Sequence, residues 1–208
     1  TVRADRLGAY GSTAGLTPNL DRLAAEGVRF SRCLTVAPIT LPAHASILTG
    51  LDPIEHGVRL NGAFALDASV PTLATQLREH GYTTGAFVSA FVLDRRFGLD
   101  EGFDVYDDHL VDGAGTDDLG PEERRGEATV ARALEFVDRA GDQPCFLWVH
   151  LFDAHAPYEA PKAFATTERA PYDAEVAYVD HCVGQLLEGL NARGRGSDAL
   201  VSVVADHG

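Results

Sequence analysis

The segment from Pro38 to Gly50 carries the residues best suited to nucleophilic chemistry. A β-rich run over residues 28–36 precedes it, and small and aliphatic residues at helical spacing follow, which predicts that Thr40 lies where a loop enters a helix. The first turn of a helix offers unpaired backbone N–H groups and the positive end of the helix dipole, which favour a phosphate or sulfate anion. Thr40 is therefore a candidate nucleophile. The alternative is that its hydroxyl only caps the helix.

A second candidate site lies at the far end of the chain. Residues 199–205 read as a buried strand, and Asp206-His207-Gly208 follows it. Open α/β sheets bind their ligands at the carboxyl ends of parallel strands. Because carboxylate and imidazole groups are ordinary ligands of zinc and related divalent cations, Asp206 and His207 are expected to bind a metal. The alternative is a polar turn after a strand.

A third group of polar residues follows the apolar run of residues 144–152, which is expected to form a central strand. Asp153 and His155 come directly after this run, at the same edge of the expected sheet as Asp206. His155 has either a catalytic or a structural role, and Asp153 orients His155 or binds a second metal. His150, within the run, is expected to be hydrogen-bonded in the core.

Four segments, in order over nearly the whole chain, resemble the sulfatase family of the alkaline phosphatase superfamily. They are Thr17 to Val28, Pro42 to Gly50, His56-Gly57-Val58 and Asp206-His207-Gly208. The resemblance implies an α/β fold with a mostly parallel sheet and helices on both faces. It also implies a hydrolase that cleaves sulfate or phosphate esters with a divalent metal (zinc, manganese or calcium). A His-x-Pro sequence like that at His155 contacts the scissile group in this family and protonates the leaving oxygen.

The sequence departs from the sulfatase pattern at the nucleophile. Ordinary sulfatases carry Cys/Ser-x-Pro-x-Arg, whose first residue becomes formylglycine, whereas this chain has Thr40-Leu41-Pro42-Ala43-His44. Thr-x-Pro-x-His resembles the nucleotide pyrophosphatase/phosphodiesterase branch, in which an unmodified Thr is the nucleophile. Thr40 is then expected to be a metal ligand as well, and His44 is expected to stabilise the equatorial oxygens of the substrate.

Two further departures concern charge and completeness. The Lys and His that hold the sulfate oxygens in sulfatases are absent near residues 88–91. The resemblance also places a metal-binding Asp directly before Thr1, so we expect a fragment truncated at both ends. Asp5 could substitute for that ligand, although a structural role in its loop is the preferred interpretation.

Composition bounds the architecture and the partners. The 208 residues are 45% hydrophobic, which suits one domain over 1–208, and the net charge is −14. Such acidity argues against nucleic acid and anionic membranes as partners, and an anionic substrate would depend on local positive charge such as a metal. The resemblance to sulfatases implies a small-molecule, glycan or lipid ester as substrate. The sequence contains no run of about 18 apolar residues, so it predicts no membrane-spanning segment. The three cysteines are expected to be small buried hydrophobic residues: Cys33, Cys145 and Cys182.

Alternating patterns predict helices over 17–27, 40–50, 71–81, 122–140 and 172–190, and strands over 28–36, 82–88, 144–152 and 199–205. The Asp-rich segment 97–120 lacks calcium-loop spacing and is expected to be a solvated surface loop. We expect His56 to fix a loop and His181 to be exposed.

Three functions from different classes remain open. The first is a metal-dependent ester hydrolase. The second is a transferase that moves a phosphoethanolamine-type headgroup, which predicts membrane-spanning helices before Thr1. The third is a non-catalytic binding relative, favoured if Thr40 lies more than about 5 Å from the metal carboxylate, well beyond a coordination distance.

Overall fold

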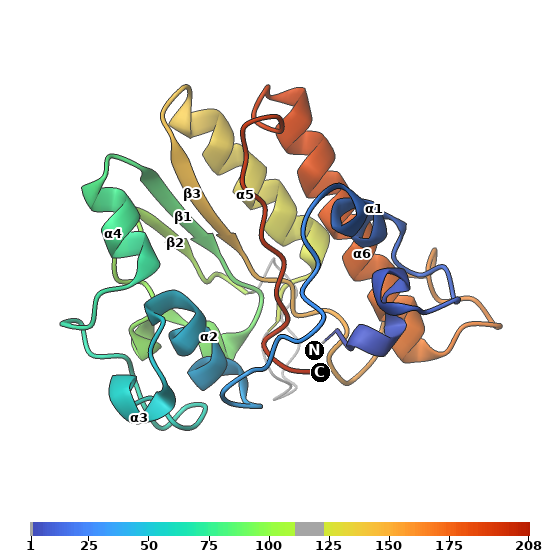
Figure 1. The fold of residues 1–208 in the computed structure, drawn as a ribbon, viewed down its shortest axis with the longest axis horizontal. Helices are drawn as coiled ribbons and strands as arrows, with labels where there is room; N and C mark the ends of the chain where they lie inside the picture. The colour runs from blue at the N-terminus through green and yellow to red at the C-terminus, as the bar shows by residue number, and fades with distance from the viewer. Residues whose placement is uncertain (1, 111–122) are drawn as a thin grey trace. The chain divides into compact units, whose positions relative to one another are not determined.

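The computed structural model describes residues 2–110 and 123–208, and the chain forms two compact units (Figure 1). The sheet unit is Thr35–Leu151, and the helical unit comprises Thr1–Leu34 and Phe152–Gly208. The expectation of one domain over residues 1–208 stays a prediction, since two compact units can belong to one domain.

The sheet unit is built on three parallel strands. β1 (Thr83–Phe87) is central and pairs with β2 (Val105–Asp107) on one side and β3 (Cys145–Val149) on the other. Ala86 lies in register with both Tyr106 and Trp148. Because all three strands run in the same direction, their carboxyl ends share one edge of the sheet.

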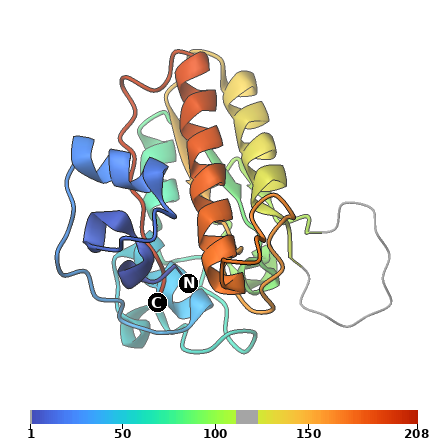
Figure 2. The ribbon, with the colours of Figure 1, turned by 90° about the vertical axis from the view of Figure 1, so that its right-hand side faces the viewer.

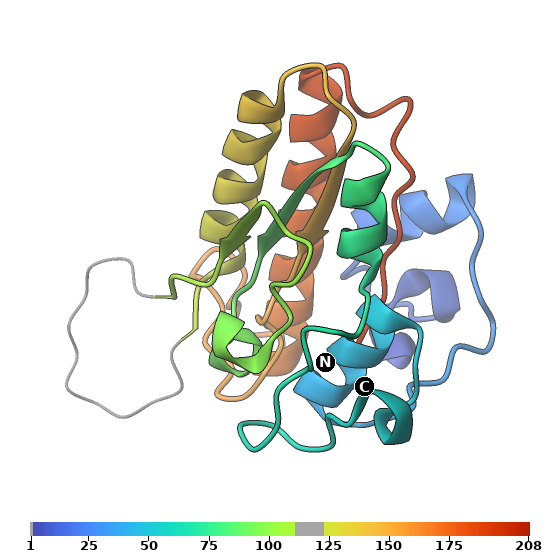
Figure 3. The ribbon, with the colours of Figure 1, turned by 90° about the vertical axis from the view of Figure 1, so that its left-hand side faces the viewer.

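Helices cover both faces of this sheet (Figure 3). On one face, Ala86, Tyr106 and Trp148 pack with apolar residues of α2 (Thr40–Thr49) and α4 (Leu73–Glu79). On the other face, α5 (Gly126–Ala140) sets Phe136 against Phe87, with ring centroids 5.8 Å apart. A Cβ at Gly85 would come within 2.9 Å of the Phe136 ring, so a glycine is what lets α5 approach the sheet.

Shorter elements complete the sheet unit. The short helix α3 spans Pro53–His56, and two 3-10 turns, Phe91–Leu93 and Arg95–Phe97, follow β1. α2 ends because Gly50 adopts a left-handed conformation (φ 72°) and donates its N–H to Ser46 O at 2.8 Å.

The helical unit packs α1 (Pro18–Glu26) against the long α6 (Pro171–Ala192) (Figures 1 and 2). The buried carboxyl of Asp180 in α6 accepts the N–H groups of Asn19 (3.1 Å) and Leu20 (2.8 Å). These N–H groups lack partners within α1, so α6 supplies the cap that α1 does not carry itself. Two 3-10 turns, Ala4–Arg6 and Gly8–Tyr10, precede α1.

The structure confirms the α/β class, the parallel sheet and the helices on both of its faces. The five predicted helices and the strands over 82–88 and 144–152 are also confirmed, within a few residues at their ends. Residue 122 lies outside the described residues, as do residues 111–120 of the predicted acidic loop.

Three secondary-structure predictions were wrong. Residues 28–36 and 199–205 form no strand; Val28 is 82% and Leu200 is 97% exposed. Both segments have strand propensity, but a strand needs a paired neighbour, and neither has one among the described residues. The loop predicted over 97–120 contains β2, which its acidic composition concealed. β3 is also an edge strand of the described sheet rather than a central one.

Candidate active site

Thr40 is the first residue of α2, and the preceding Ile39 is extended. The side chain of Thr40 is only 7% exposed and caps no helix N–H, so the cap interpretation is wrong. Its hydroxyl makes no hydrogen bond to another of the described residues. The fold therefore leaves this oxygen available for chemistry.

Backbone donors at the start of α2 are largely engaged. Leu41 N–H donates to Asn61 Oδ1 (2.9 Å), Pro42 has no N–H, and Ala43 N–H donates to Ile39 O (3.0 Å). The expectation of a backbone anion site in this turn was thus wrong for these positions, because a side-chain amide occupies the N–H of Leu41. Side chains must supply most of the donors to a bound anion.

His44 lies one turn after Thr40 on the same face of α2. Its Nδ1 is 2.8 Å from Thr40 O, and since a carbonyl only accepts, Nδ1 carries the hydrogen. The buried ring is 5.6 Å from the Trp148 ring and 5.0 Å from that of His150, centroid to centroid. The four-residue spacing thus places the His44 imidazole beside Thr40 at the start of α2.

His150 follows β3 directly and is half-buried rather than enclosed in the core. Its N–H donates to Phe87 O (2.9 Å), and its Nδ1 accepts from Ser89 N–H (3.4 Å). Sequence reasoning expected the hydrogen bonding but missed the position beside His44. No local spacing signals this contact, because His44 and His150 belong to elements that lie far apart in the chain.

Arg124, which sequence reasoning also missed, organises the same sheet edge. It is 4% exposed and donates to Asp107 Oδ1 (2.8 Å), Val88 O (2.9 Å) and Thr129 Oγ1 (3.0 Å). Burial raises the pKa of the Asp107 carboxyl, but the hydrogen bond and charge of Arg124 outweigh it and leave that pKa below its ordinary value.

A chain of hydroxyl groups connects Arg124 to His150. Ser89 Oγ donates its only hydrogen to His150 O at 2.6 Å, so in the 2.6 Å pair of hydroxyls Thr129 Oγ1 is the donor and Ser89 Oγ the acceptor. Thr129 Oγ1 in turn accepts from Arg124 and also lies 3.3 Å from Arg125 O. Such a chain is mutually polarising and holds the loop at the end of β3 in one position.

Asp206 and His207 lie together in the helical unit. The buried Asp206 accepts the N–H of His207 on Oδ1 (2.9 Å), and its Oδ2 is 3.4 Å from His207 Nε2. Donors at this separation can share one divalent cation at bond lengths of about 2.0–2.2 Å, so the pair fits as two metal ligands. In residues 2–110 and 123–208, no cluster of three or more His, Cys, Asp or Glu side chains is arranged for a metal.

His155 lies in the loop between β3 and α6, within the helical unit. Its ring stacks on Phe152 with centroids 4.3 Å apart, and Nδ1 donates to Ala156 O (2.8 Å). Asp153 is buried two residues earlier. The ring of His155 is therefore oriented by contacts within its own loop.

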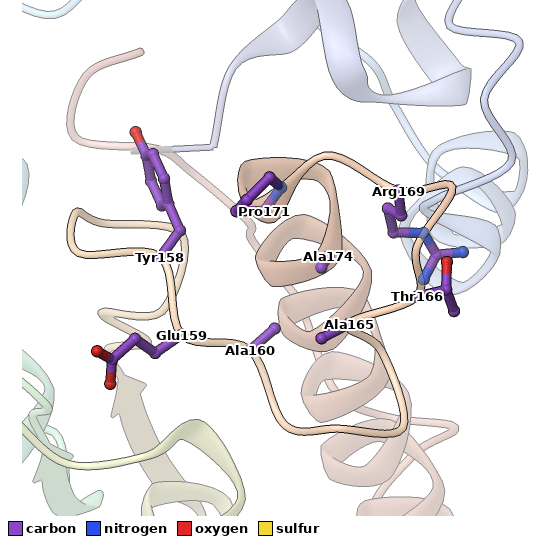
Figure 4. A pocket seen from close by; sticks show the side chains of 8 residues that line it. All are labelled: Tyr158, Glu159, Ala160, Ala165, Thr166, Arg169, Pro171 and Ala174. Carbon is purple, nitrogen blue, oxygen red and sulfur yellow. The ribbon is translucent and has the colours of Figure 1, made fainter.

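A cavity of about 190 Å³ continues from this loop (Figure 4). Its lining combines an exposed tyrosine ring, a guanidinium, a carboxyl and a hydroxyl with small apolar residues of the loop and of the start of α6. The lining residues are Tyr158, Glu159, Ala160, Ala165, Thr166, Arg169, Pro171 and Ala174.

His56 and Asp5 have structural partners. His56 is buried in α3, where Nδ1 accepts from Val58 N–H (3.1 Å), so Nε2 donates to Ser46 Oγ (2.9 Å); its predicted structural role is confirmed. Asp5 forms an exposed ion pair with Arg3 (2.7 Å).

Three exposure predictions were wrong, those for His181, Cys33 and Cys145. His181 is half-buried against Phe164, and Cys33 is exposed because its segment forms no buried strand. Cys145 is intermediate and Cys182 buried, and all three thiols are free.

The described carboxylates of the Asp-rich segment make hydrogen bonds and ion pairs with residues near β2. Asp104 accepts from Thr84 N–H, and Asp108 pairs with Arg95 at 2.8 Å. These carboxylates hold β2 and the turns around it.

The whole chain, residues 1–208, matches the family model described as Sulfatase. The chain belongs to the sulfatase family. It is 29% identical to human N-acetylgalactosamine-6-sulfatase over 97% of this chain and 47% of that protein, so it spans about half the length of this relative.

Solved structures show the same fold. A protein in the alkaline phosphatase superfamily from Vibrio parahaemolyticus matches with a TM-score of 0.71 at 24% identity, over 91% of this chain and 48% of that one. The lipoteichoic acid synthase LtaP from Listeria monocytogenes matches with a TM-score of 0.69 at 20% identity, over 86% and 47%. At these identities the likeness establishes the fold alone.

No helix in the described part of the chain is long and apolar enough to cross a membrane. Thr40 belongs to the sheet unit and Asp206 to the helical unit. The distance between them, which is the criterion for a non-catalytic relative, therefore stays a prediction.

Proposed function

We propose that the protein hydrolyses sulfate or phosphate esters, with Thr40 as the nucleophile. The observation that carries the proposal is the Thr40 hydroxyl at the start of α2, without a hydrogen-bond partner among the described residues and in one unit with His44 and His150. The Thr40 oxygen is not one of the fully buried unpaired atoms of the described residues, so it can be reached from solvent, as a nucleophile must be.

In the proposed reaction, Thr40 Oγ1 loses its proton to solvent water and attacks the sulfur or phosphorus atom. The bond to the ester oxygen breaks on the opposite side, and His155 donates a proton to that leaving oxygen. Water then attacks the covalent Thr40 ester and releases sulfate or phosphate, regenerating the hydroxyl. His44 and His150 bind the equatorial oxygens in place of the absent Lys and His.

Asp206 and His207 are proposed to hold a divalent metal, with zinc, manganese or calcium as candidates and Thr40 as a further ligand. A bound divalent cation offsets the charge of the ester and favours the alkoxide of a coordinated hydroxyl.

The unmodified Thr and the likeness of Thr-x-Pro-x-His to the phosphodiesterase branch favour phosphate over sulfate chemistry. The name of the human relative instead suggests a sulfated sugar. A sugar ester suits the cavity after His155, because an aromatic ring and a guanidinium are common partners of a sugar face and its anionic group. The ester preference is the point to be measured.

The test compares turnover of p-nitrophenyl sulfate, phosphate and a phosphate diester by the full-length protein with zinc, manganese, calcium or a chelator. Thr40→Ala is expected to lower kcat by about 10³-fold or more. Thr49→Ala is the matched control, since Thr49 ends the same helix and donates to Ala45 O. Equal activity of wild type and Thr40→Ala would overturn the nucleophile.

A further inference from the structure

The loop that carries Asp153 and His155 turns on a left-handed residue. Ala154 has φ 71° and is the one non-glycine with positive φ in the described residues. A side chain with a Cβ is disfavoured there, so such a residue is held by its surroundings. Strained positions of this kind concentrate where a site must be fixed in one geometry.

A buried carboxyl contacts this residue. Glu175 lies in the second turn of α6, is 2% exposed, and accepts the Ala154 N–H on Oε2 at 3.0 Å. Its helix neighbours Ala174 and Val176 are buried apolar residues. Glu is almost never fully buried unless it is paired, which makes a bond to loop backbone a specific use of the side chain.

The contacts of the His155 ring do not duplicate this one. Phe152 and Ala156, which orient the ring, belong to the same loop, so their contacts with the ring do not themselves connect the loop to α6. The bond from Ala154 to Glu175 joins the residue between Asp153 and His155 to a helix of 22 residues.

We propose that Glu175 is a positioning residue, which holds Ala154 in its left-handed conformation and so aims His155 at the leaving oxygen. The proposal rests on the proposed function for its catalytic consequence. The anchoring of the loop by Glu175 does not depend on any reaction.

The helix offers a matched control. Asp180, also in α6 and 2% exposed, accepts the N–H groups of Asn19 and Leu20 at the start of α1. Loss of either carboxyl removes a buried hydrogen-bond acceptor from the same helix. Of the two, Glu175 bonds to the loop of His155, whereas Asp180 bonds to α1.

The experiment uses the full-length protein with Glu175→Met, Glu175→Gln and Asp180→Leu. Met keeps the length and packing of the side chain without an acceptor, whereas Gln keeps an amide oxygen. Amide hydrogen exchange at Ala154 reports the anchor without turnover. We expect exchange at Ala154 to accelerate roughly tenfold or more in Glu175→Met, to change little in Glu175→Gln, and to match wild type in Asp180→Leu.

Turnover of esters with good and poor leaving groups tests the aim of His155. Glu175→Met is expected to lower kcat for an alkyl ester by about 10²-fold and for the p-nitrophenyl ester much less, because only a poor leaving group needs the proton. Asp180→Leu is expected to affect both esters equally.

Unchanged exchange at Ala154 in Glu175→Met would overturn the anchor. Faster exchange with an unaltered leaving-group dependence would overturn the positioning of His155. If wild type cleaves no ester, the proposed function fails, and the exchange result still decides whether Glu175 holds the loop.

Discussion

The imidazole Nδ1 of His44 donates to the carbonyl oxygen of Thr40 across 2.8 Å. The four-residue spacing within a helix makes this bond possible, because residues i and i+4 share a face. The bond fixes the tautomer of His44 and ties its ring to the residue that carries the candidate nucleophile. The bond depends on the side chain of His44 alone, because its acceptor is the main-chain carbonyl of Thr40, so an exchange of Thr40 would leave the bond in place.

Replacing His44 tests its part in binding the transferred group. His44→Phe keeps a ring against Trp148 and His150 but removes both nitrogens, so we expect kcat/KM to fall by about 10²-fold with little change in folding. His80→Phe is the control, because His80 makes the same kind of bond to Gln76 O (2.8 Å) in α4. Both variants are measured by steady-state kinetics. Equal losses of kcat/KM would show that His44 does not bind the transferred group.

Arg124 is expected to be a large contributor to stability. Arg124→Met leaves the Asp107 carboxylate and the Thr129 hydroxyl without their buried donor, which should lower the free energy of unfolding by about 3 kcal/mol. The exposed Arg139, 4.0 Å from Glu135, provides the comparison, and Arg139→Met should cost less than about 0.5 kcal/mol. Urea titration measures both, and similar small losses would contradict the account.

Stability should fall on mild acidification because of His56. Burial lowers the pKa of its imidazole from an ordinary value near 6.5, against the smaller opposing effects of its own backbone, Asp52 and Glu55. The unfolded chain therefore binds the proton more tightly. The stabilising contribution is fully present above about pH 6.5 and is lost as the pH falls through the lowered folded pKa.

The measurement for His56 is the free energy of unfolding at several pH values between about 7.5 and 5. His56→Gln, which cannot titrate, should show a shallower decline than wild type. An identical decline in both proteins would show that burial does not disfavour protonation of His56.

Asp206 is predicted to decide metal content. Asp206→Asn weakens one ligand of the proposed pair, so we expect the purified full-length protein to retain much less zinc, manganese or calcium and to lose about 10²-fold in kcat. Asp198→Asn is the control, because Asp198 is exposed in the turn before residues 199–205. Elemental analysis of wild type and both variants provides the readout, and equal metal in all three would exclude Asp206 as a ligand.

The sequence revealed elements whose signal is local. α2 was predictable from its apolar spacing and from Gly50, and β1 and β3 from their apolar runs. Residues 199–205 have the same composition as a buried strand yet pair with nothing described, because strand formation depends on a neighbour rather than on propensity.

The candidate site divides in the same way. Thr40 and His44 were visible because one helix carries both at a fixed spacing. His150, Arg124 and Glu175 were not, since each acquires its role from a partner far along the chain: Arg124 from Val88, and Glu175 from Ala154. Spacing predicts neighbours on one element, whereas tertiary contacts appear only in the folded chain.

The most direct test of the account is to trap the covalent intermediate on Thr40. Full-length protein is mixed with a p-nitrophenyl ester, quenched in acid within the first turnover, digested and examined by mass spectrometry. The account predicts that the peptide containing Thr40 gains one phosphoryl or sulfuryl group, and that the gain is absent in Thr40→Ala. Turnover of the ester with no modified Thr40, or with the group on another residue, would contradict it.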